Sequence, residues 1–350
     1  MSELAPRKAV LDLAPYSPPT AGRAGKLRLD FNENTVGSSP RVIEYLKKQL
    51  SAEGLSVYPE YAETKAAVAD FFRVSTDNFI LTNGTDEAIQ VLVNTFVDDD
   101  QEVIVLHPAY AMYRFYAEVA GARVREISYR EADLGFPEEE LLDAITPATR
   151  AVLLANPNNP TGTGIGVAEM ERILEKAAGA AVLIDEAYYE FSGVTALGLI
   201  SSYPNLFVSR TFSKVYGMAA LRIGCLFSQP RNVAYLHKAQ SPYSVNMLAA
   251  IAVRAAIQDT EFVSSYVAEA LAARERIYAG LARLGIETFP SQANFVLFRI
   301  GPRSLEIRDK LREKGVLVRD RSYEISGCVR VTAGTRAQAE RFLKELEILL

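Results

Sequence analysis

From about residue 78 the chain alternates short β-rich runs with helical stretches, and this alternation constrains its fold more than any other feature. Runs that are apolar throughout are typical of strands buried on both faces, and strands that alternate with helices form mostly parallel sheets. We therefore expect an α/β fold with a mostly parallel central sheet sandwiched by helices. The predicted strands span residues 79–82, 103–106, 151–154, 181–184 and 206–209.

The length of 350 residues exceeds what one hydrophobic core usually supports, so we expect a large and a small domain. Residues 1–30 are rich in Pro and Ala and predict an irregular N-terminal arm, not a packed element. Residues 31–260 would form the large domain, and residues 261–350 a smaller α+β domain. We expect the arm to return to this small domain or to reach a partner subunit. In the small domain the predicted strands span 294–298 and 328–331, and the predicted helices 305–313 and 337–349, after a linking helix over 260–284.

Composition argues against several classes of partner. The net charge is −5, with acids and bases interspersed, which disfavours nucleic-acid binding. No apolar run approaches the roughly 20 residues that span a bilayer, and the first residues lack the apolar core of a signal peptide, so we expect a cytoplasmic protein with no membrane partner. Cys225 and Cys328 are predicted to be buried free thiols. His107 and His237 fall in no zinc-binding spacing, so no metal is expected.

Polar motifs follow the predicted strands, where the ligands of open α/β sheets bind. Gly84-Thr85-Asp86-Glu87 follows the first strand and opens a helix. In that arrangement backbone N–H groups and the helix dipole can hold a phosphate, although the same string could be a capping sequence. Further along, Thr211, Ser213, Lys214 and Arg222 bring two hydroxyls, an amine and a guanidinium around what could be one phosphate.

Two other motifs lie between these. The string from Asn156 to Gly162 is strongly turn-forming and can aim Asn159 into a site, although it could also be only a loop. Asp185 ends an apolar strand, where an isolated carboxylate is costly, and pairing with a protonated ring nitrogen would resolve that cost. A helix N-cap is the alternative role. Tyr188 gains interest only from its position three residues after Asp185.

Taken together, these motifs make the chain resemble the fold-type I pyridoxal 5′-phosphate aminotransferases, and most closely the histidinol-phosphate aminotransferase family. The resemblance covers nearly the whole chain, from Asn32-Glu33-Asn34 to Arg330-Val331-Thr332. It implies the fold-type I transferase fold and pyridoxal phosphate as cofactor, which needs a lysine for its aldehyde and an acid for its ring nitrogen. It also implies a homodimer whose two active sites are shared between subunits.

The resemblance assigns the cofactor contacts residue by residue. Lys214 would form the imine with the cofactor aldehyde and then move the substrate Cα proton, a task that the few histidines leave to it. Asp185 would pair with the ring nitrogen, and Tyr188 and Asn159 would bond the phenolic oxygen. The phosphate would lie among Gly84, Thr85, Asp86, Thr211, Ser213 and Arg222. Tyr110 would stack on the ring, and Tyr58 would reach the phosphate from the partner subunit, with plain core packing as the alternative for both.

On the substrate side the resemblance implies that Arg330 binds the substrate carboxylate and that Arg319 and Tyr16 contact a substrate phosphate. Asn34 belongs to the segment that would line this side. The family often reads Asn-Glu-Asn-Pro followed by an aromatic residue there, whereas this chain reads Asn32-Glu33-Asn34-Thr35-Val36-Gly37. The missing proline and aromatic residue leave the cofactor contacts untouched and affect the substrate pocket.

The activity that the resemblance implies is a ping-pong transamination. Histidinol phosphate and 2-oxoglutarate would give imidazole acetol phosphate and glutamate, a step of histidine biosynthesis. An aromatic or other amino-acid aminotransferase is the nearest alternative, and a decarboxylase acting on a phosphorylated amino acid is another. A dinucleotide-binding oxidoreductase is disfavoured because no G-x-G-x-x-G follows the first strand. The intact lysine disfavours a silent binding protein, and the lack of room for a DNA-binding domain disfavours a regulator.

Overall fold

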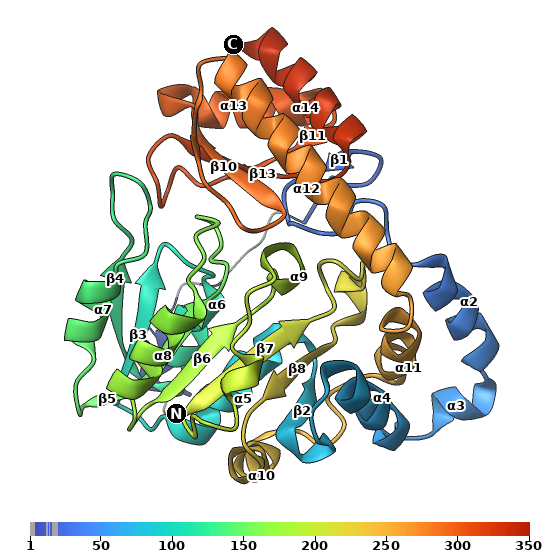
Figure 1. Ribbon diagram of the computed structural model, residues 1–350, viewed down its shortest axis with the longest axis vertical. Helices are drawn as coiled ribbons and strands as arrows, with labels where there is room; N and C mark the ends of the chain where they lie inside the picture. The colour runs from blue at the N-terminus through green and yellow to red at the C-terminus, as the bar shows by residue number, and fades with distance from the viewer. Residues whose placement is uncertain (1–3, 12, 14, 16–19) are drawn as a thin grey trace.

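The computed structural model describes residues 4–11, 13, 15 and 20–350. Its centre is a seven-stranded sheet with the strand order β2-β8-β7-β6-β5-β3-β4 (Figure 1). Within this sheet β8 runs antiparallel to both of its neighbours, and the other pairs are parallel, so the predicted mostly parallel sheet is confirmed. The strands are β2 Phe79–Thr82, β3 Glu102–His107, β4 Arg123–Ser128, β5 Thr149–Ala155, β6 Ala181–Asp185, β7 Leu206–Thr211 and β8 Gly224–Phe227.

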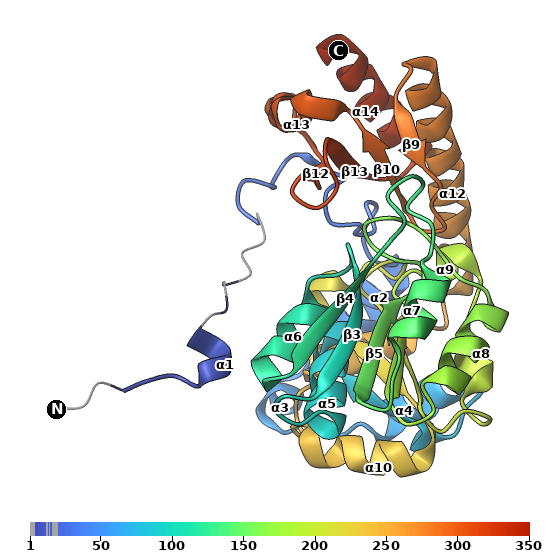
Figure 2. The same ribbon diagram turned by 90° about the vertical axis from the view of Figure 1, so that its left-hand side faces the viewer.

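Alternate residues of each central strand are buried on opposite faces of the sheet. On β3, Val103 and Val105 join one core cluster, whereas Ile104 and Leu106 join another. Burying such a side chain contributes roughly 1.5–3 kcal/mol, which explains why these strands are apolar throughout. Figure 2 shows helices on both sides of the sheet. The helices that pack in the cluster of Val103 and Val105 are α5 Gly84–Phe96, α6 Met112–Ala120 and α10 Pro230–Ala239.

The opposite face is covered by a larger set of helices, the first of which begins at Pro40 with Ser39 as its N-cap. Ser39 accepts a hydrogen bond from the backbone N–H of Arg41, as an N-cap serine does at a helix start. The helices of this part of the chain are α2 Pro40–Gln49, α3 Ala52–Ser56, α4 Ala62–Phe72, α7 Glu138–Ala144, α8 Val167–Lys176, α9 Tyr189–Ser192 and α11 Met247–Ala256.

The long helix α12, Thr260–Arg283, leads from the large sheet to a smaller body built on a four-stranded antiparallel sheet (Figure 1). This body has a hydrophobic core of its own, to which Phe298 and Phe342 belong. The predicted strands and helices of the C-terminal part are therefore confirmed. The elements that correspond to these predictions are β10 Phe295–Arg299, α13 Ser304–Glu313, β13 Cys328–Thr332 and α14 Arg336–Leu349. Three short strands of this part were not predicted, namely β9 Glu287–Phe289, β11 Val316–Leu317 and β12 Arg319–Asp320.

The N-terminal arm is not irregular throughout, and that part of the prediction is wrong. It contains a short helix, α1 Lys8–Leu11, and a short strand, β1 Leu27–Arg28, that pairs in parallel with β11. The next residue, Leu29, is fully buried in the core of the small body and donates its N–H to the carbonyl of Leu317. A two-residue strand carries too little pattern to be recognised from sequence, and its pairing partner lies almost 290 residues further along the chain.

Candidate active site

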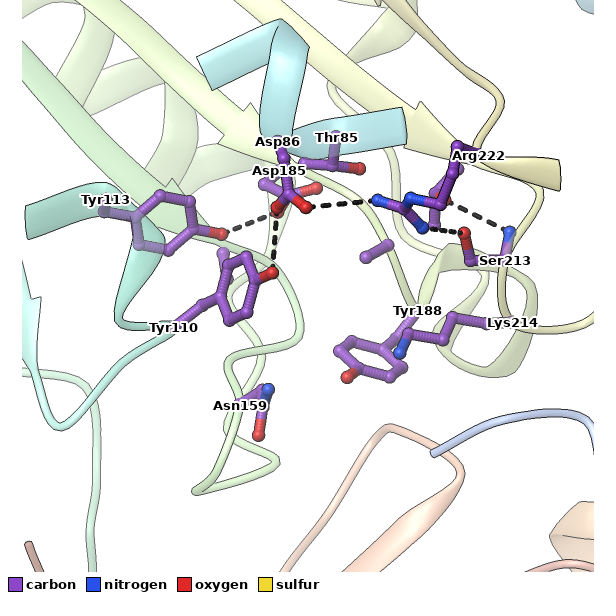
Figure 3. Close-up of a pocket in the computed structure, with 13 residues that line it drawn as sticks. Thr85, Asp86, Tyr110, Tyr113, Asn159, Asp185, Tyr188, Ser213, Lys214 and Arg222 are labelled. Atoms are coloured by element: carbon purple, nitrogen blue, oxygen red, sulfur yellow. Dashed lines mark hydrogen bonds and ion pairs between the residues drawn. The ribbon is translucent and has the colours of Figure 1, made fainter. Parts of the chain in front are cut away.

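A cavity opens where the predicted motifs meet, at the carboxyl ends of the parallel strands (Figure 3). This is where open α/β sheets bind their ligands. Ten of the thirteen residues that line it were predicted from sequence. These ten are Thr85, Asp86, Tyr110, Asn159, Asp185, Tyr188, Thr211, Ser213, Lys214 and Arg222, and the other three are Tyr113, Ala155 and Ala187.

The N-terminus of α5 and the side chain of Arg222 form one end of the cavity. Gly84 has φ +75°, which favours glycine, and a Cβ there would lie 2.5 Å from Nη2 of Arg222 and would displace the guanidinium. The Thr85 hydroxyl is buried and has no hydrogen-bond partner among the described residues. Arg222 donates to Ser213 Oγ at 3.3 Å and to Asp86 Oδ2 at 3.1 Å. Helix N–H groups, an unused hydroxyl and a guanidinium fit a phosphate dianion.

Asp185 lies at the centre of the cavity and is 3% exposed. It accepts a hydrogen bond from the Tyr113 hydroxyl at 2.6 Å (Figure 3) and another from Ser209 Oγ at 2.8 Å. Burial raises the pKa of Asp185 to about 6, and the two hydrogen bonds oppose that shift. A carboxylate held in this way would gain from a cationic partner, and a protonated ring nitrogen is one that fits.

Lys214 lines the same cavity and donates from Nζ to the carbonyl of Phe31 at 3.1 Å. Its Nζ lies 5.7 Å from the centre of the Tyr188 ring. The Tyr188 ring is buried and meets Phe295 edge to face at 5.3 Å, while its hydroxyl accepts a hydrogen bond from Asn32 Nδ2 at 2.9 Å. A primary amine beside a fixed aromatic wall is suited to react with an aldehyde and to carry a proton.

Tyr110 follows β3 and lies over the same space, with its hydroxyl donating to Asp86 Oδ1 at 2.8 Å. Its ring meets that of Tyr113 edge to face, with 5.8 Å between the ring centres. The ring is therefore held from two sides. A flat cofactor ring at Asp185 would find an aromatic surface nearby, as the sequence predicts.

A second cavity adjoins the first, shares Lys214 and Tyr188 with it, and is rich in arginine. Arg330 is 4% exposed, bonds to the side-chain oxygen of Asn159 and donates to the carbonyl of Asp30 at 2.6 Å. Its Nε is buried without a hydrogen-bond partner among the described residues. Burial lowers the pKa of Arg330 to about 10, and the neighbouring positive charges of Arg321 and Arg319 act in the same direction. An anion at this wall would relieve that destabilisation.

Among the described residues, the predicted site residues Asn34 and Tyr58 do not line these cavities. Asn34 is buried, donates to the carbonyl of Val215 and accepts from the N–H of Val36, so its polar groups are already used. Asn32 and Glu33 line the arginine-rich cavity instead. Tyr58 is 74% exposed and stacks on Tyr243 with 4.4 Å between ring centres. Tyr16 lies outside the described residues.

Sequence reasoning missed three polar residues that form hydrogen bonds with the predicted residues Asp185 and Tyr188. Tyr113 follows Tyr110 by three residues, across the turn that opens α6, and the two rings are in contact. Ser209 is directly opposite Asp185 in the register of β6 and β7, so a strand alignment would have found it. Asn32 had no local signal, because the residue it bonds lies 156 positions away.

Within the described part of the chain, no group of three or more His, Cys, Asp or Glu side chains could hold a metal ion. Among the same residues, no helix has both the length and the apolar character needed to cross a membrane. Cys225 and Cys328 are buried and free, as predicted.

Comparisons with known proteins agree with this geometry. The model of the family "Aminotransferase class I and II" matches residues 24–346, so the chain belongs to the class I and II aminotransferases. It is thus a pyridoxal-phosphate-dependent aminotransferase of fold type I, as the sequence motifs predict. The oxidoreductase and silent-binder alternatives are set aside by this membership.

More specific similarity is to histidinol-phosphate aminotransferases. That of Symbiobacterium thermophilum is 34% identical over 358 residues, covering 98% of each chain. That of Thermococcus gammatolerans is 36% identical over 324 residues, covering 92% of this chain and 91% of the relative.

Two solved structures show the same fold. A Burkholderia pseudomallei protein described as a putative aminotransferase has a TM-score of 0.82 at 29% identity, with 93% of this chain and 98% of that chain covered. The histidinol-phosphate aminotransferase from Sinorhizobium meliloti, solved in complex with pyridoxal 5′-phosphate, has a TM-score of 0.88 at 24% identity, with 100% and 99% covered.

Proposed function

We propose that this protein transfers the amino group of histidinol phosphate to 2-oxoglutarate, giving imidazole acetol phosphate and glutamate in histidine biosynthesis. The observation that carries the proposal is the buried Arg330 beside Arg319 and Arg321, on the wall that adjoins Lys214. The histidinol-phosphate aminotransferases above support it, because this chain matches them over most of their length.

The cofactor wall provides the general chemistry. When bound, pyridoxal phosphate supplies an aldehyde carbon that takes the amino group and a ring that stores the electrons released at Cα. The α5 N-terminus, the Thr85 hydroxyl and Arg222 would hold its phosphate, and Asp185 its ring nitrogen. Tyr188 and Asn159 would bond its phenolic oxygen. The Lys214 amine would carry the proton between the substrate Cα and the adjoining carbon.

The arginine-rich wall provides the specificity. The two substrates of a ping-pong reaction occupy one site in turn, and here both are anions: one ends in a phosphate, the other in a second carboxylate. Arg330 is positioned two residues before the end of β13, and Arg319 is its partner in register on β12. Two guanidinium groups on adjacent strands can bind either anion bidentately. Tyr16 remains a predicted contact to the substrate phosphate, and Asn34 a predicted member of the same pocket.

The decisive experiment is a half-reaction with purified enzyme loaded with cofactor. The loss of the cofactor absorbance band is followed by rapid mixing with histidinol phosphate, glutamate or phenylalanine, one at a time. We expect histidinol phosphate to give the largest second-order rate constant, with glutamate active as the amino product of the second half-reaction. Faster reaction with phenylalanine would contradict the proposal and assign an aromatic aminotransferase. Release of CO₂ without need of a keto acid would assign a decarboxylase.

We further propose that the enzyme is a homodimer with Tyr58 completing the partner's phosphate site. Tyr58 and Tyr243 stack on the surface, and the neighbouring helices α2 and α3 expose several large apolar side chains. A group of exposed large apolar side chains on neighbouring segments is a candidate interaction site. The exposed side chains are Ile43, Leu50, Leu55, Val57, Tyr58 and Tyr243.

Sedimentation at several protein concentrations tests the dimer. Leu55→Asp should shift the protein toward monomer and weaken cofactor binding, because a monomer would lack the partner's tyrosine. Ile348→Asp is a matched control, since Ile348 is equally exposed but lies on the C-terminal helix α14. A dimer unaffected by Leu55→Asp would place the interface elsewhere.

The remaining parts of the proposal concern organisation and location. We propose a large cofactor-binding domain over residues 31–260 and a small domain over residues 261–350, which the arm 1–30 joins through β1. The separate hydrophobic core of the small body and the pairing of β1 with β11 support this division. Free buried thiols at Cys225 and Cys328 support a reducing compartment such as the cytoplasm.

A further inference from the structure

Asn32 joins three parts of the molecule that are far apart in sequence. It lies just after Leu29, in a left-handed backbone conformation with φ 56°, and is 1% exposed. Its backbone N–H donates to Thr332 Oγ1 at 3.0 Å, and the Thr332 hydroxyl lies 3.1 Å from its side-chain oxygen. Its side-chain nitrogen donates to the Tyr188 hydroxyl oxygen at 2.9 Å. The fully buried Thr332 at the end of β13 is thus connected to Tyr188 through one amide.

The number of protons available to these three residues fixes the direction of each hydrogen bond between them. The Thr332 oxygen already accepts the Asn32 backbone N–H, so its own single proton is free to be donated to the Asn32 side-chain oxygen. That leaves the Asn32 NH₂ group facing Tyr188. If the amide were turned over, the buried Thr332 hydroxyl proton would have no acceptor among its contacts in the described chain, which is unfavourable.

The consequence concerns the Tyr188 hydroxyl. Because its oxygen accepts a hydrogen bond from Asn32, the hydroxyl must donate its own proton to another acceptor. Tyr188 lines the cavity together with Asn159 and Lys214, so an acceptor in the cavity is within its reach. Hydrogen bonds in a chain strengthen one another, so accepting from Asn32 makes Tyr188 a better donor. An asparagine at this position therefore sets the tyrosine up to donate into the cavity.

We propose that Asn32 and Thr332 are positioning residues that orient the Tyr188 hydroxyl as a donor to the phenolic oxygen of the bound cofactor. This role depends on the binding of pyridoxal phosphate and not on the identity of the substrate. A donor to the phenolic oxygen stabilises its ionised form. Weakening the donor should therefore raise the pH at which the absorbance of the bound cofactor changes.

The test uses a pair of neutral substitutions. Thr332→Val keeps the shape of the side chain but removes the hydroxyl that holds the Asn32 amide in its orientation, whereas Thr332→Ser keeps the hydroxyl. The absorbance of the loaded enzyme is titrated with pH. We expect the midpoint of Thr332→Val to rise by about half to one pH unit, the size expected from weakening one hydrogen bond, and that of Thr332→Ser to stay near the wild-type value.

A double-mutant cycle with Tyr188→Phe separates this role from a general disturbance of the fold. If Thr332 acts through the Tyr188 hydroxyl, Thr332→Val should cause no further shift in the Tyr188→Phe background. A shift of equal size in both backgrounds, or no shift in the wild-type background, would overturn the proposal.

Asn32→Asp gives an independent measure. Aspartate tolerates the left-handed conformation, but its carboxylate cannot donate and would accept the Tyr188 proton instead. We expect a midpoint shift of the same sign and at least as large as that of Thr332→Val, with folding checked by circular dichroism. A midpoint at or below the wild-type value would contradict the proposed direction of the protons.

Discussion

The two walls of the active-site cavity are built from different kinds of sequence. The cofactor wall consists of residues that directly follow or end strands of the large sheet, such as Thr85, Asp185 and Ser213. The substrate wall combines Asn32 and Glu33 near the N-terminus with Arg319 and Arg330 of the small body, almost 300 residues away. The cofactor wall is therefore positioned by local structure. The substrate wall depends on how the N-terminal segment and the small body pack on the large sheet.

This difference predicts that the two walls can be disabled separately. The largest effect should come from Lys214→Ala on the cofactor wall. It removes the amine that reacts with the aldehyde and carries the proton, so kcat should fall by at least about 10⁴-fold. Cofactor should still bind through its phosphate contacts, which equilibrium dialysis can measure. Retention of more than about one hundredth of the activity would contradict the assigned role.

On the substrate wall, Arg330→Met should have the next largest effect on activity. Losing a buried charged hydrogen-bonding group that binds an anion costs about 3–4 kcal/mol, or roughly a 10²–10³-fold loss of kcat/KM. Bound cofactor should remain, because Arg330 does not line the phosphate end of the cavity. The measurement is steady-state kinetics with both substrates. Arg336→Met is the matched control, since that arginine lies on the surface and pairs with Glu269.

An equal loss of kcat/KM in Arg330→Met and in the control Arg336→Met would contradict the role assigned to Arg330. A loss of bound cofactor from Arg330→Met would show that the two walls are not separable. One contact does join them, since Arg330 bonds to Asn159 of the cofactor wall. A small change in the cofactor spectrum of Arg330→Met would therefore be expected, and it should be far smaller than that of Lys214→Ala.

The same difference explains what could be predicted from sequence. Strands that are apolar throughout set the sheet, and the residues just after them set the cofactor wall, so both followed from local patterns. Asn34 shows where this reasoning ends. Its neighbours Asn32 and Glu33 reach the cavity instead, because the left-handed conformation at Asn32 turns the segment. No local pattern distinguishes one asparagine of that string from the other.

Tyr113 and Tyr58 illustrate two other reasons why part of the site could not be predicted from the sequence. Tyr113 lay within reach of a sequence argument, since it follows the predicted Tyr110 by only three residues, but its contact with Asp185 depends on how α6 packs on the sheet. For Tyr58, the predicted role belongs to a contact between subunits, and a single chain leaves that side chain on the surface.

Tyr113→Phe should have a moderate effect, confined to the cofactor wall. The Tyr113 hydrogen bond opposes the burial that raises the pKa of Asp185, so its loss should raise that pKa further. More of Asp185 would then be protonated near neutral pH. We expect the acid limb of the kcat/KM profile to move up by about half to one pH unit. Tyr129→Phe, at a buried tyrosine away from the cavity, is the control and should leave the profile unchanged. An unmoved acid limb in Tyr113→Phe would argue against the coupling.

The smallest predicted effect is on stability, and it asks whether the cofactor wall is strained without its ligand. Burial raises the pKa of Asp185 from the ordinary 3.8 to about 6. The stabilisation that comes from protonation is therefore complete below about pH 3.8 and is lost as the pH rises through 6. At pH 8 the cofactor-free protein carries the full cost, up to about 3 kcal/mol.

Asp185→Asn removes that cost, so at pH 8 the cofactor-free variant should unfold roughly 3 °C higher than the cofactor-free wild type, and the two should converge near pH 4. Adding pyridoxal phosphate should stabilise the wild type more than the variant, because only the carboxylate can pair with a cationic ring nitrogen. Thermal unfolding with and without cofactor measures both effects, with the exposed Asp143→Asn as control. A cofactor-free Asp185→Asn protein less stable than wild type at pH 8 would mean that Tyr113 and Ser209 fully offset the burial. The Asp185 end of the cavity would then be preorganised, as rigid as the sheet that positions it.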